Sequence, residues 1–156
     1  SGTDNWVSIS TGSMVGTTSR GEKEIAIDTS GNVWMINSSS NGLVYLDKAT
    51  GTITNYTIGI TVPNIIDSVV LTQAGTILLT LTIEESTVGG SAGVYVPALV
   101  EFDGVSSSTV LFWDSGYSNS SVSTTRMSPP IEITAGTVRF YSISSNGTYF
   151  HEVTGV

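Results

Sequence analysis

One unit of strand, turn and strand recurs along this chain, and it constrains the fold more than any other feature. Three strands begin alike, at Gly31-Asn-Val-Trp, Gly75-Thr-Ile-Leu and Gly136-Thr-Val-Arg. Each follows a short apolar strand and precedes a strand that ends in an acid, at Asp47, Asp103 and Glu152. In the first two copies a fourth strand follows, over 52–58 and 109–114. Self-similarity of this kind indicates a repeat architecture.

The spacing between these landmarks supports the alignment. The repeated glycine lies 12 positions before the next strand in the first and third copies and 24 positions before it in the second. The second copy therefore carries a hairpin that is longer by 12 residues, and the alignment places His151 with Leu46 and Phe102. Each unit is a four-stranded meander of about 45 to 60 residues, which is the period of a β-propeller blade.

Strands such as LVYL, TILLTLTI and TVLFW are apolar on both faces, as expected for a sheet that is covered on both sides. We therefore predict an all-β fold, a propeller-like array of three four-stranded antiparallel meanders in one domain over 1–156. The units are placed at about 24–58, 68–114 and 131–156. A β-sandwich or jelly roll is the alternative, because Thr alternates with Leu over 76–83.

The third unit lacks its fourth strand, since the sequence given ends four residues after Glu152. A counterpart stands at the other end, in Trp6-Val-Ser-Ile-Ser10. Joined end to end, HEVTGV and SGTDNWVSISTG match EFDGVSSSTVLFWDSG in length, turn residues and strand content. The step from the acid to the next repeated glycine is 28 and 33 positions in the first two units and 35 through the joined ends.

Three blades are too few for a closed ring. An unpaired edge strand also invites pairing. We therefore predict that strand 6–10 of one copy completes the third unit of another, giving a homo-oligomeric ring or a filament. The assembly residues predicted on this basis are Trp6, Val7 and Ile9, together with Glu84, Glu85 and Tyr95 of the long hairpin, which we expect to project from the body and contact a partner.

The stretch over 28–56 resembles the blade of the streptogramin lyase, NHL and SMP-30-like propeller families. Those blades carry D-x-x-G-N-[VIL]-W followed by G-x-[VIL]-x-x-[LID]-D-x-x-T-G. The matching residues are Asp28, Gly31, Asn32, Val33, Trp34, Gly42, Val44, Asp47, Thr50 and Gly51. The resemblance implies an architecture and no active site, because the His and acidic metal ligands of the lyases have no matching positions here.

Composition narrows the classes of partner. The formal net charge is −8, and such a surface repels nucleic acid and anionic lipid. The sequence has no cysteine, which excludes disulfides and thiolate metal sites. It also has no apolar run of the roughly 20 residues that a membrane-spanning helix needs. Only 12% of residues are charged while Ser and Thr abound, which is typical of extracellular, cell-surface or virion-surface β proteins.

No catalytic constellation emerges from the sequence. A single histidine without a nucleophile elbow argues against a Ser–His triad. The adjacent Glu84 and Glu85 do not form a carboxylate pair across a cleft. The acids at Asp28 and Asp47 fit the needs of tight turns, although such turns also suit calcium. We predict no enzyme activity, no cofactor and no metal.

Aromatic residues are the main indication of a ligand, since sugar rings stack on aromatic faces. The candidates are Trp34, Tyr45, Trp113, Tyr117, Tyr141 and Tyr149. Four sequons offer possible glycosylation sites, at Asn37, Asn55, Asn119 and Asn146. The sequence thus predicts a non-enzymatic structural module that assembles with itself. The alternative is a carbohydrate-binding propeller lectin or adhesin, and half of a propeller lyase comes third.

Overall fold

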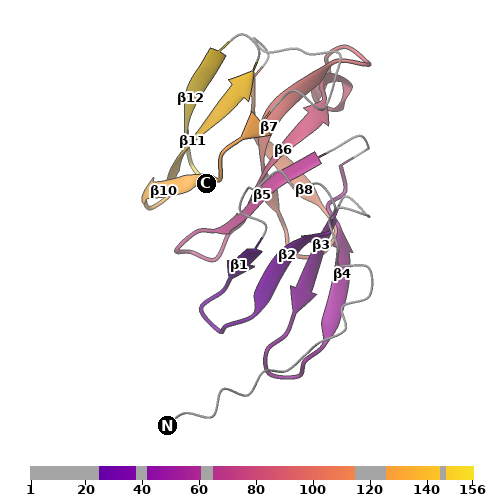
Figure 1. Ribbon diagram of the computed structural model, residues 1–156, viewed down its shortest axis with the longest axis vertical. Helices are drawn as coiled ribbons and strands as arrows, with labels where there is room; N and C mark the ends of the chain where they lie inside the picture. The colour runs from indigo at the N-terminus through magenta and orange to yellow at the C-terminus, as the bar shows by residue number, and fades with distance from the viewer. Residues whose placement is uncertain (1–24, 38–41, 61–64, 115–125, 145–146) are drawn as a thin grey trace.

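The structure is a computed structural model that describes residues 25–37, 42–60, 65–114, 126–144 and 147–156 (Figure 1). The described chain is built of antiparallel strands, as predicted, and its one helix is the short 3-10 helix η1 (Glu85–Val88). Sheet A contains β1 (Ile25–Ile27), β2 (Val33–Asn37), β3 (Gly42–Leu46) and β4 (Ile53–Thr57). Sheet B contains β5 (Ile65–Leu71), β6 (Ile77–Glu84), β7 (Tyr95–Phe102) and β8 (Ser108–Trp113). Sheet C contains β9 (Arg126–Met127), β10 (Ile131–Thr134), β11 (Thr137–Ser144) and β12 (Gly147–Thr154).

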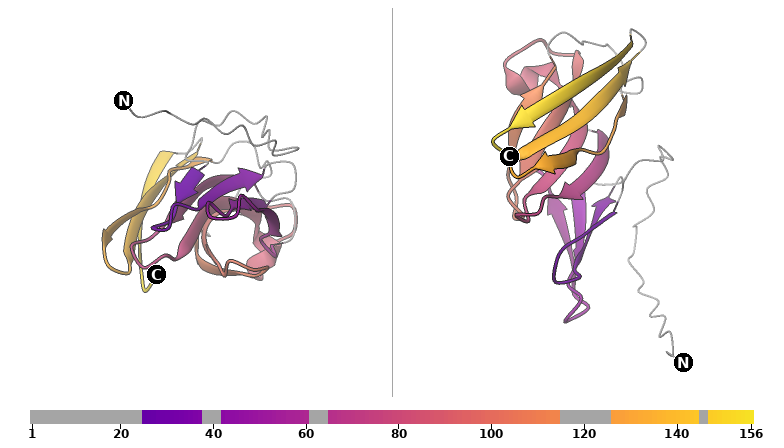
Figure 2. Two further views of the ribbon diagram at one scale, coloured as in Figure 1. Left: turned by 90° about the horizontal axis from the view of Figure 1, so that it is seen from below. Right: turned by 90° about the vertical axis from the view of Figure 1, so that its left-hand side faces the viewer.

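Sheet B is the middle layer of the molecule. One cluster of buried side chains joins it to sheet A, and a second, smaller cluster joins it to sheet C. The first strands of the three sheets lie next to one another, with β5 in contact with both β1 and β9 (Figures 1 and 2). The three antiparallel sheets therefore follow one another in sequence order, with sheet B between sheets A and C.

The repeated glycines of the first two units occupy equivalent turns. Gly31 and Gly75 both have a positive φ, of 86° and 88°, which a residue with a Cβ rarely adopts. Their amides donate to the carbonyls of Asp28 and Thr72 respectively, and the side chains of these two residues accept from the backbone of Asn32 and Thr76. The turn chemistry thus repeats at the level of individual hydrogen bonds.

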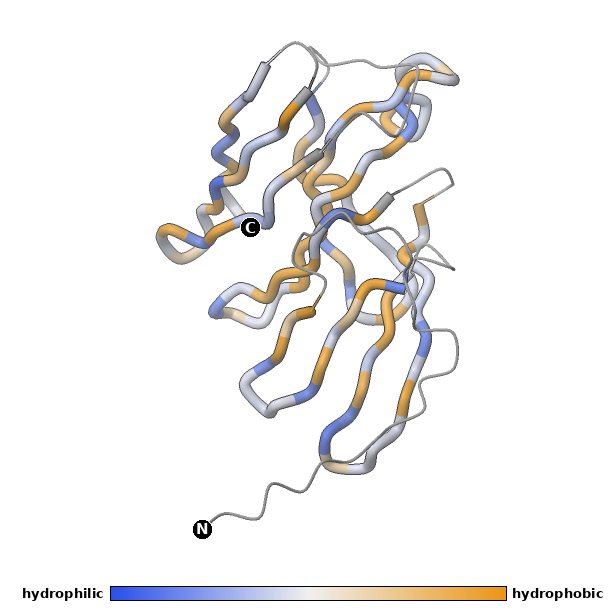
Figure 3. The backbone as a smooth tube through the Cα atoms, in the orientation of Figure 1, coloured by the Kyte–Doolittle hydropathy of each residue, from blue (hydrophilic) through white to orange (hydrophobic). Residues whose placement is uncertain are grey.

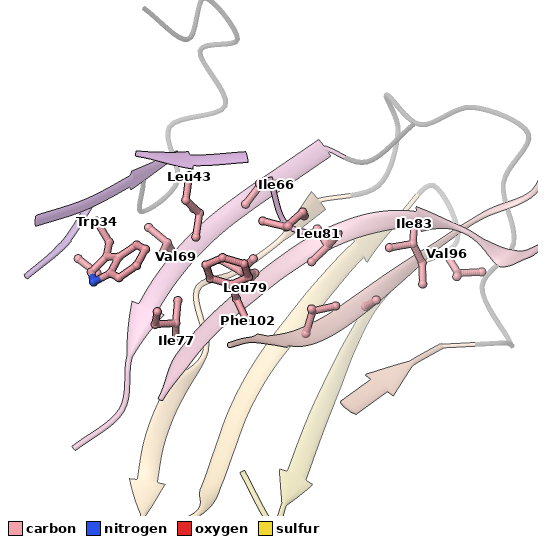
Figure 4. Packing of buried hydrophobic residues seen from close by; sticks show 14 residues of the cluster. Trp34, Leu43, Ile66, Val69, Ile77, Leu79, Leu81, Ile83, Val96 and Phe102 are labelled. Atoms are coloured by element: carbon pink, nitrogen blue, oxygen red, sulfur yellow. The ribbon is translucent and has the colours of Figure 1, made fainter. Parts of the chain in front are cut away.

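The two-sided apolar character of the middle strands is explained by their position. On β6, Ile77, Leu79, Leu81 and Ile83 point toward sheet A, while Leu78, Thr80 and Thr82 point toward sheet C. All of these side chains are buried. Figure 4 shows the four that point toward sheet A. Hydrophobic segments accordingly run along the strands of sheet B (Figure 3).

The third unit differs from the prediction in width. Strands β9 and β10 both pair with the same side of β11, so together they make one interrupted strand rather than two neighbours. Pro129 and Pro130 stand at the interruption, where proline removes the amide donors that a ladder needs. Within the described residues sheet C is therefore three strands wide, and the predicted fourth strand, 6–10, lies outside them.

The alignment of His151 with Leu46 and Phe102 is wrong by two residues. Leu46 pairs with Val33 and Phe102 with Ile77, but the equivalent Val138 pairs with Val153. The strands of the third hairpin are longer than those of the first. The equal spacing from the repeated glycine to the next strand therefore did not reveal the two-residue shift in register. A shift of two keeps side chains on the same face of a strand, so the prediction of an ordinary strand position is unaffected.

The long hairpin at 84–96 is part of the core at its base. Compared with the hairpin of sheet A, it adds three residues to each strand and six to the loop, which accounts for the 12 extra residues. Ile83 and Val96 are fully buried, and Val88 of η1 packs against the same cluster. The expectation that this hairpin projects from the body is therefore wrong for its base.

Candidate assembly interface

The outer face of sheet A is largely apolar, and no sheet covers it within the described residues, although Val44 on this face is only 1% exposed. Strand pairing places two rows of side chains across it, Ile27–Val33–Leu46–Ile53 and Ile25–Met35–Val44–Asn55. Ile25 and Ile27 are 50% and 64% exposed. Isoleucines this exposed are common singly, but here they stand side by side on one face.

The outer face of sheet C is the second such surface. Its rows are Ile131–Arg139–Glu152, Tyr141–Phe150 and Ile143–Thr148. Phe150 is 84% exposed, Ile131 67%, Ile143 43% and Tyr141 39%. The rings of Tyr141 and Phe150 lie 6.1 Å apart, centroid to centroid, and form the aromatic centre of the face.

One exposed ion pair borders this aromatic centre. The Nε of Arg139 donates to Oε2 of Glu152 at 2.7 Å, across the β11–β12 ladder. In water such a pair contributes little to stability. It does neutralise both charges on an otherwise apolar face, and a face of this kind is suited to burial against another surface.

The two outer faces are structurally equivalent to the two faces of sheet B. Val33, Ile77 and Val138 each stand two residues after a repeated glycine. Ile77 faces sheet A and Val138 faces sheet B, so this position always looks toward the preceding sheet. In sheet A the same position belongs to the outer face.

The opposite face follows the same rule. Trp34 packs into the cluster with sheet B, and Leu78 packs into the cluster with sheet C. The equivalent residue of sheet C is Arg139, on its outer face. The three sheets therefore stack in one direction. The outer face of sheet A corresponds to the face with which sheets B and C contact the preceding sheet. The outer face of sheet C corresponds to the face with which sheets A and B contact the following sheet.

The structure describes three of the six assembly residues predicted from sequence. Trp6, Val7 and Ile9 lie outside the described residues. Glu84 and Glu85 hold the hairpin loop: Glu84 accepts from the amide of Gly93 at 2.6 Å, and Glu85 accepts from the amide of Ser91 at 3.0 Å. The hydrogen bond from the amide of Gly93, followed by one from the side chain of Ser86, lowers the pKa of Glu84. Tyr95 pairs with Glu84 in the ladder, so a partner contact by any of the three stays a prediction.

The aromatic ligand candidates do not converge on one site. Trp34, Tyr45 and Trp113 all pack on the cluster between sheets A and B, where the ring centroids of Trp34 and Tyr45 are 4.6 Å apart. Tyr141 lies on the outer face of sheet C and Tyr149 on its edge strand β12. Tyr117 is outside the described residues.

An open hollow of about 380 Å³ lies at the turn end of sheet A. Ser30, Asn32, Tyr45, Asp47, Lys48 and Ala49 line it. Partial burial, followed by the nearby carboxylates of Asp28 and Asp47, raises the pKa of Tyr45 and keeps its phenol protonated. The hollow therefore offers one aromatic ring with hydrogen-bonding groups of both kinds around it.

The acids at the turns are engaged within the protein. Asp28 accepts from the side chain of Asn32 and from the amides of Ser30 and Asn32, and these bonds, the Asn32 side chain first, lower its pKa. Asp103 accepts from three successive amides of its own turn, which likewise lowers its pKa. Across the described part of the chain, groups of three or more potential metal-ligating His or acidic side chains do not occur.

His151 lies between sheets B and C, and its surroundings could not be read from sequence. Its ring packs against those of Phe112 and Phe140, at centroid distances of 4.8 and 5.0 Å, and these two rings are 5.6 Å apart. Its Nε2 is 2.9 Å from Oγ of Ser142, a distance that also suits a nucleophile and its base. Ser142 is only 1% exposed, however, so its hydroxyl is closed to a substrate. This pair is best explained as packing.

Two of the four sequons can be placed. Asn37 and Asn55 lie on the outer face of sheet A, and the Nδ2 of Asn37 donates to Oδ1 of Asn55 at 3.3 Å. A glycan on Asn55 would stand directly on the row that contains Ile25 and Met35. Asn119 and Asn146 lie outside the described residues.

Comparison with known proteins does not identify the chain. Family models and curated proteins were both searched, and neither search produced a match. The resemblance to propeller blades therefore stays a prediction from sequence. Among the helices that the structure describes, none is long and apolar enough to cross a membrane.

Proposed function

We propose that this chain is a non-enzymatic structural module that assembles with copies of itself, with the outer face of sheet C on one copy packed against the outer face of sheet A on the next. The observation that carries the proposal is the equivalence of these faces to those already packed inside the molecule. The step from sheet A to B and from B to C would be repeated from C to the next copy's A.

The chemistry of the two faces supports this pairing. Both carry exposed apolar side chains, Ile25 and Ile27 on the edge strand β1 at one end and Tyr141 and Phe150 on β11 and β12 at the other. Burial of apolar surface gives roughly 25 cal/mol per Å². The charges of Arg139 and Glu152 already neutralise each other, so burying them leaves no isolated charge.

A contact between two different faces is heterologous. Such contacts produce a closed ring when the rotation between copies closes, and a filament when it does not. Two copies of three sheets would give a six-bladed ring. The hydroxyl-rich, weakly charged composition further supports a place on the surface of a cell or virion, as part of a fibre, sheath or appendage.

The test is a pair of variants measured by analytical ultracentrifugation. Phe150→Asp disables the sheet C face and Ile27→Asp disables the sheet A face, so each variant alone should sediment as a 16.3 kDa monomer. Mixed in equal amounts, they retain one intact pair of faces and should form dimers and nothing larger. Val105→Asp, at an exposed turn of sheet B, is the matched control and should assemble like the parent chain.

Two outcomes would overturn the proposal. One is a parent chain that stays monomeric at high concentration. The other is a mixture of Phe150→Asp and Ile27→Asp that forms no dimer although each variant is folded by circular dichroism. If only Phe150→Asp disrupts assembly, two identical faces meet instead, and the head-to-tail contact is wrong.

The hollow beside Tyr45 favours a second candidate function, carbohydrate binding. An aromatic ring flanked by Asp47 and Lys48 matches the groups that bind sugar hydroxyls and the apolar face of a sugar ring. A glycan array with the parent chain and Tyr45→Ala tests it. Binding that Tyr45→Ala abolishes supports a lectin, and an array without signal removes this candidate.

A further inference from the structure

One pair of side chains recurs at equivalent positions on the three sheets. The first residue of each pair stands five positions after the repeated glycine of its unit. The pairs are Ile36–Leu43 in sheet A, Thr80–Leu99 in sheet B and Tyr141–Phe150 in sheet C. Leu43 belongs to the cluster between sheets A and B, and Leu99 to the cluster between sheets B and C. Phe150 therefore stands where the other two sheets place a leucine against the following sheet.

Burial at this position differs between the inner contacts and the end of the stack. Leu43 and Leu99 are both 0% exposed, whereas Phe150 is 84% exposed, the largest fraction for any large apolar side chain among the described residues. A single exposed apolar residue is ordinary by itself. Phe150 is different because its position is fully buried in both contacts within the chain, and this equivalence indicates a contact residue.

The surface that receives the two leucines belongs to the first strand of the following sheet. Leu43 lies in one cluster with Val69 of β5, and Figure 4 shows its side chain pointing toward that strand. Leu99 lies in one cluster with Met127 of β9. The receiving strand equivalent to β5 and β9 is β1 of sheet A, since each is the first strand of its sheet.

Strand β1 presents Ile25 at the position of Val69. Val69 pairs with Leu79 and Ile25 with Met35, and the paired residue stands four positions after the repeated glycine in both units. Ile25 is 50% exposed on the outer face of sheet A. We propose that Phe150 of one copy anchors the assembly by packing against Ile25 of the next copy, in the way that the internal leucines pack on the following sheet. This inference rests on the proposed head-to-tail assembly.

The surroundings of Phe150 suit an anchor. The ring of Tyr141 extends the apolar surface, and the neutralised pair of Arg139 and Glu152 borders it. In protein interfaces a few central aromatic side chains, enclosed by weaker contacts that exclude water, account for most of the binding free energy. Truncation of Phe150 should therefore weaken assembly strongly, and a leucine should replace it well because both internal contacts use one.

A dimer with a single contact measures the role of Phe150. The Ile27→Asp chain keeps its sheet C face and the Phe150→Asp chain keeps its sheet A face, so their mixture forms one contact. In the Ile27→Asp chain, Phe150→Ala should weaken the dimer about tenfold or more in sedimentation experiments. Phe150→Leu should stay within about threefold. Val105→Ala truncates an exposed valine of a sheet B turn and is the matched control, which should leave the dissociation constant unchanged.

A double-mutant cycle in the same dimer identifies the partner of Phe150. Ile25→Ala and Ile53→Ala are introduced separately into the Phe150→Asp chain, where Ile53 lies on β4, at the other edge of the same face. If Phe150 packs on Ile25, the two truncations together should weaken the dimer by less than the product of their separate effects. With Ile53→Ala the separate effects should multiply.

Four results would overturn the inference. A dimer that loses less than about tenfold with Phe150→Ala would mean that Phe150 is not the anchor, although the contact between the faces stands. A loss with Phe150→Leu as large as with Phe150→Ala would contradict the equivalence with the internal leucines. Coupling of Phe150 to Ile53 as strong as to Ile25 would mean that the faces meet in another register. A mixture of folded chains without any dimer would remove the proposed function, and this inference with it.

Discussion

The two contacts of sheet B share one geometry and differ in chemistry. Toward sheet A it presents mainly apolar side chains, which join the rings of Trp34, Tyr56 and Phe102 in one large cluster. Toward sheet C it buries hydroxyls, and Ser68 and Thr80 share a hydrogen bond of 2.6 Å there. The same backbone arrangement therefore tolerates either a mainly apolar core or a partly polar one, in which most but not all buried polar atoms have hydrogen-bond partners.

The largest expected effect is at the apolar contact. Phe102 is buried between Trp34 and Tyr56, so Phe102→Ala leaves a cavity that several rings border and should lower the free energy of unfolding by about 4 kcal/mol. Urea unfolding followed by circular dichroism measures this loss. A decrease below about 1 kcal/mol would contradict the view that sheets A and B share a rigid core.

The matching substitution on the other side should have a smaller effect. Phe140 is buried between sheets B and C, but its cluster is smaller and sheet C is the end layer, which can shift to fill a cavity. Phe140→Ala should therefore cost about 3 kcal/mol in the same urea experiment. A larger loss than that of Phe102→Ala would reverse the ranking of the two contacts.

Two neighbouring threonines of β6 should respond with opposite signs. Thr80→Val leaves the buried hydroxyl of Ser68 without its partner and should destabilise by about 1 to 2 kcal/mol. Thr82 Oγ1 is buried with no hydrogen-bond partner among the described residues, so Thr82→Val should stabilise by about 1 kcal/mol.

The pair of threonine variants contains its own control, since both make the same chemical change on the same strand and face. Thermal melts of the two variants beside the parent chain measure the difference. The combination Ser68→Ala with Thr80→Val should restore most of the loss, because neither hydroxyl is then left alone. Equal destabilisation by both valines would show that shape, rather than hydrogen bonding, decides this contact.

The smallest expected effect is a pH dependence at the contact between sheets B and C. Burial lowers the pKa of His151 in the folded chain, and the carboxylate of Asp114 opposes this shift only in part. The folded chain thus binds a proton less readily than the unfolded one. The stability it contributes is present above pH 6.5 and is lost as the pH falls through that value toward the lower folded pKa.

Melting temperatures measured between pH 7.5 and 5 test this expectation. His151→Phe keeps a ring against Phe112 and Phe140 and should flatten the dependence in this range, while the parent chain loses stability on the acid side. A parent chain whose melting temperature rises as the pH falls would mean that the attraction of Asp114 outweighs burial.

Prediction from sequence succeeded where local chemistry repeats. The turn glycines, the turn-capping acids and the apolar runs determine strands and hairpins over a few residues each, so sheets A and B could be predicted with their strand order. The long hairpin was predicted in length but not in position. Its burial depends on contacts between Ile83, Val96 and Val88, which are separated along the chain and share no local pattern.

What the sequence by itself determined is the all-β repeat of three meanders, because hydrogen-bonded turns and strand periodicity are local properties. Only the tertiary structure decided the rest: the two-residue register shift of the third unit, the placement of His151 against Phe112 and Phe140, and the exposure of one apolar face at each end of the stack. The physical reason is that a strand covered on both faces needs the same apolar residues in either case. Its two neighbours can be two sheets of its own chain, or one such sheet and a second copy.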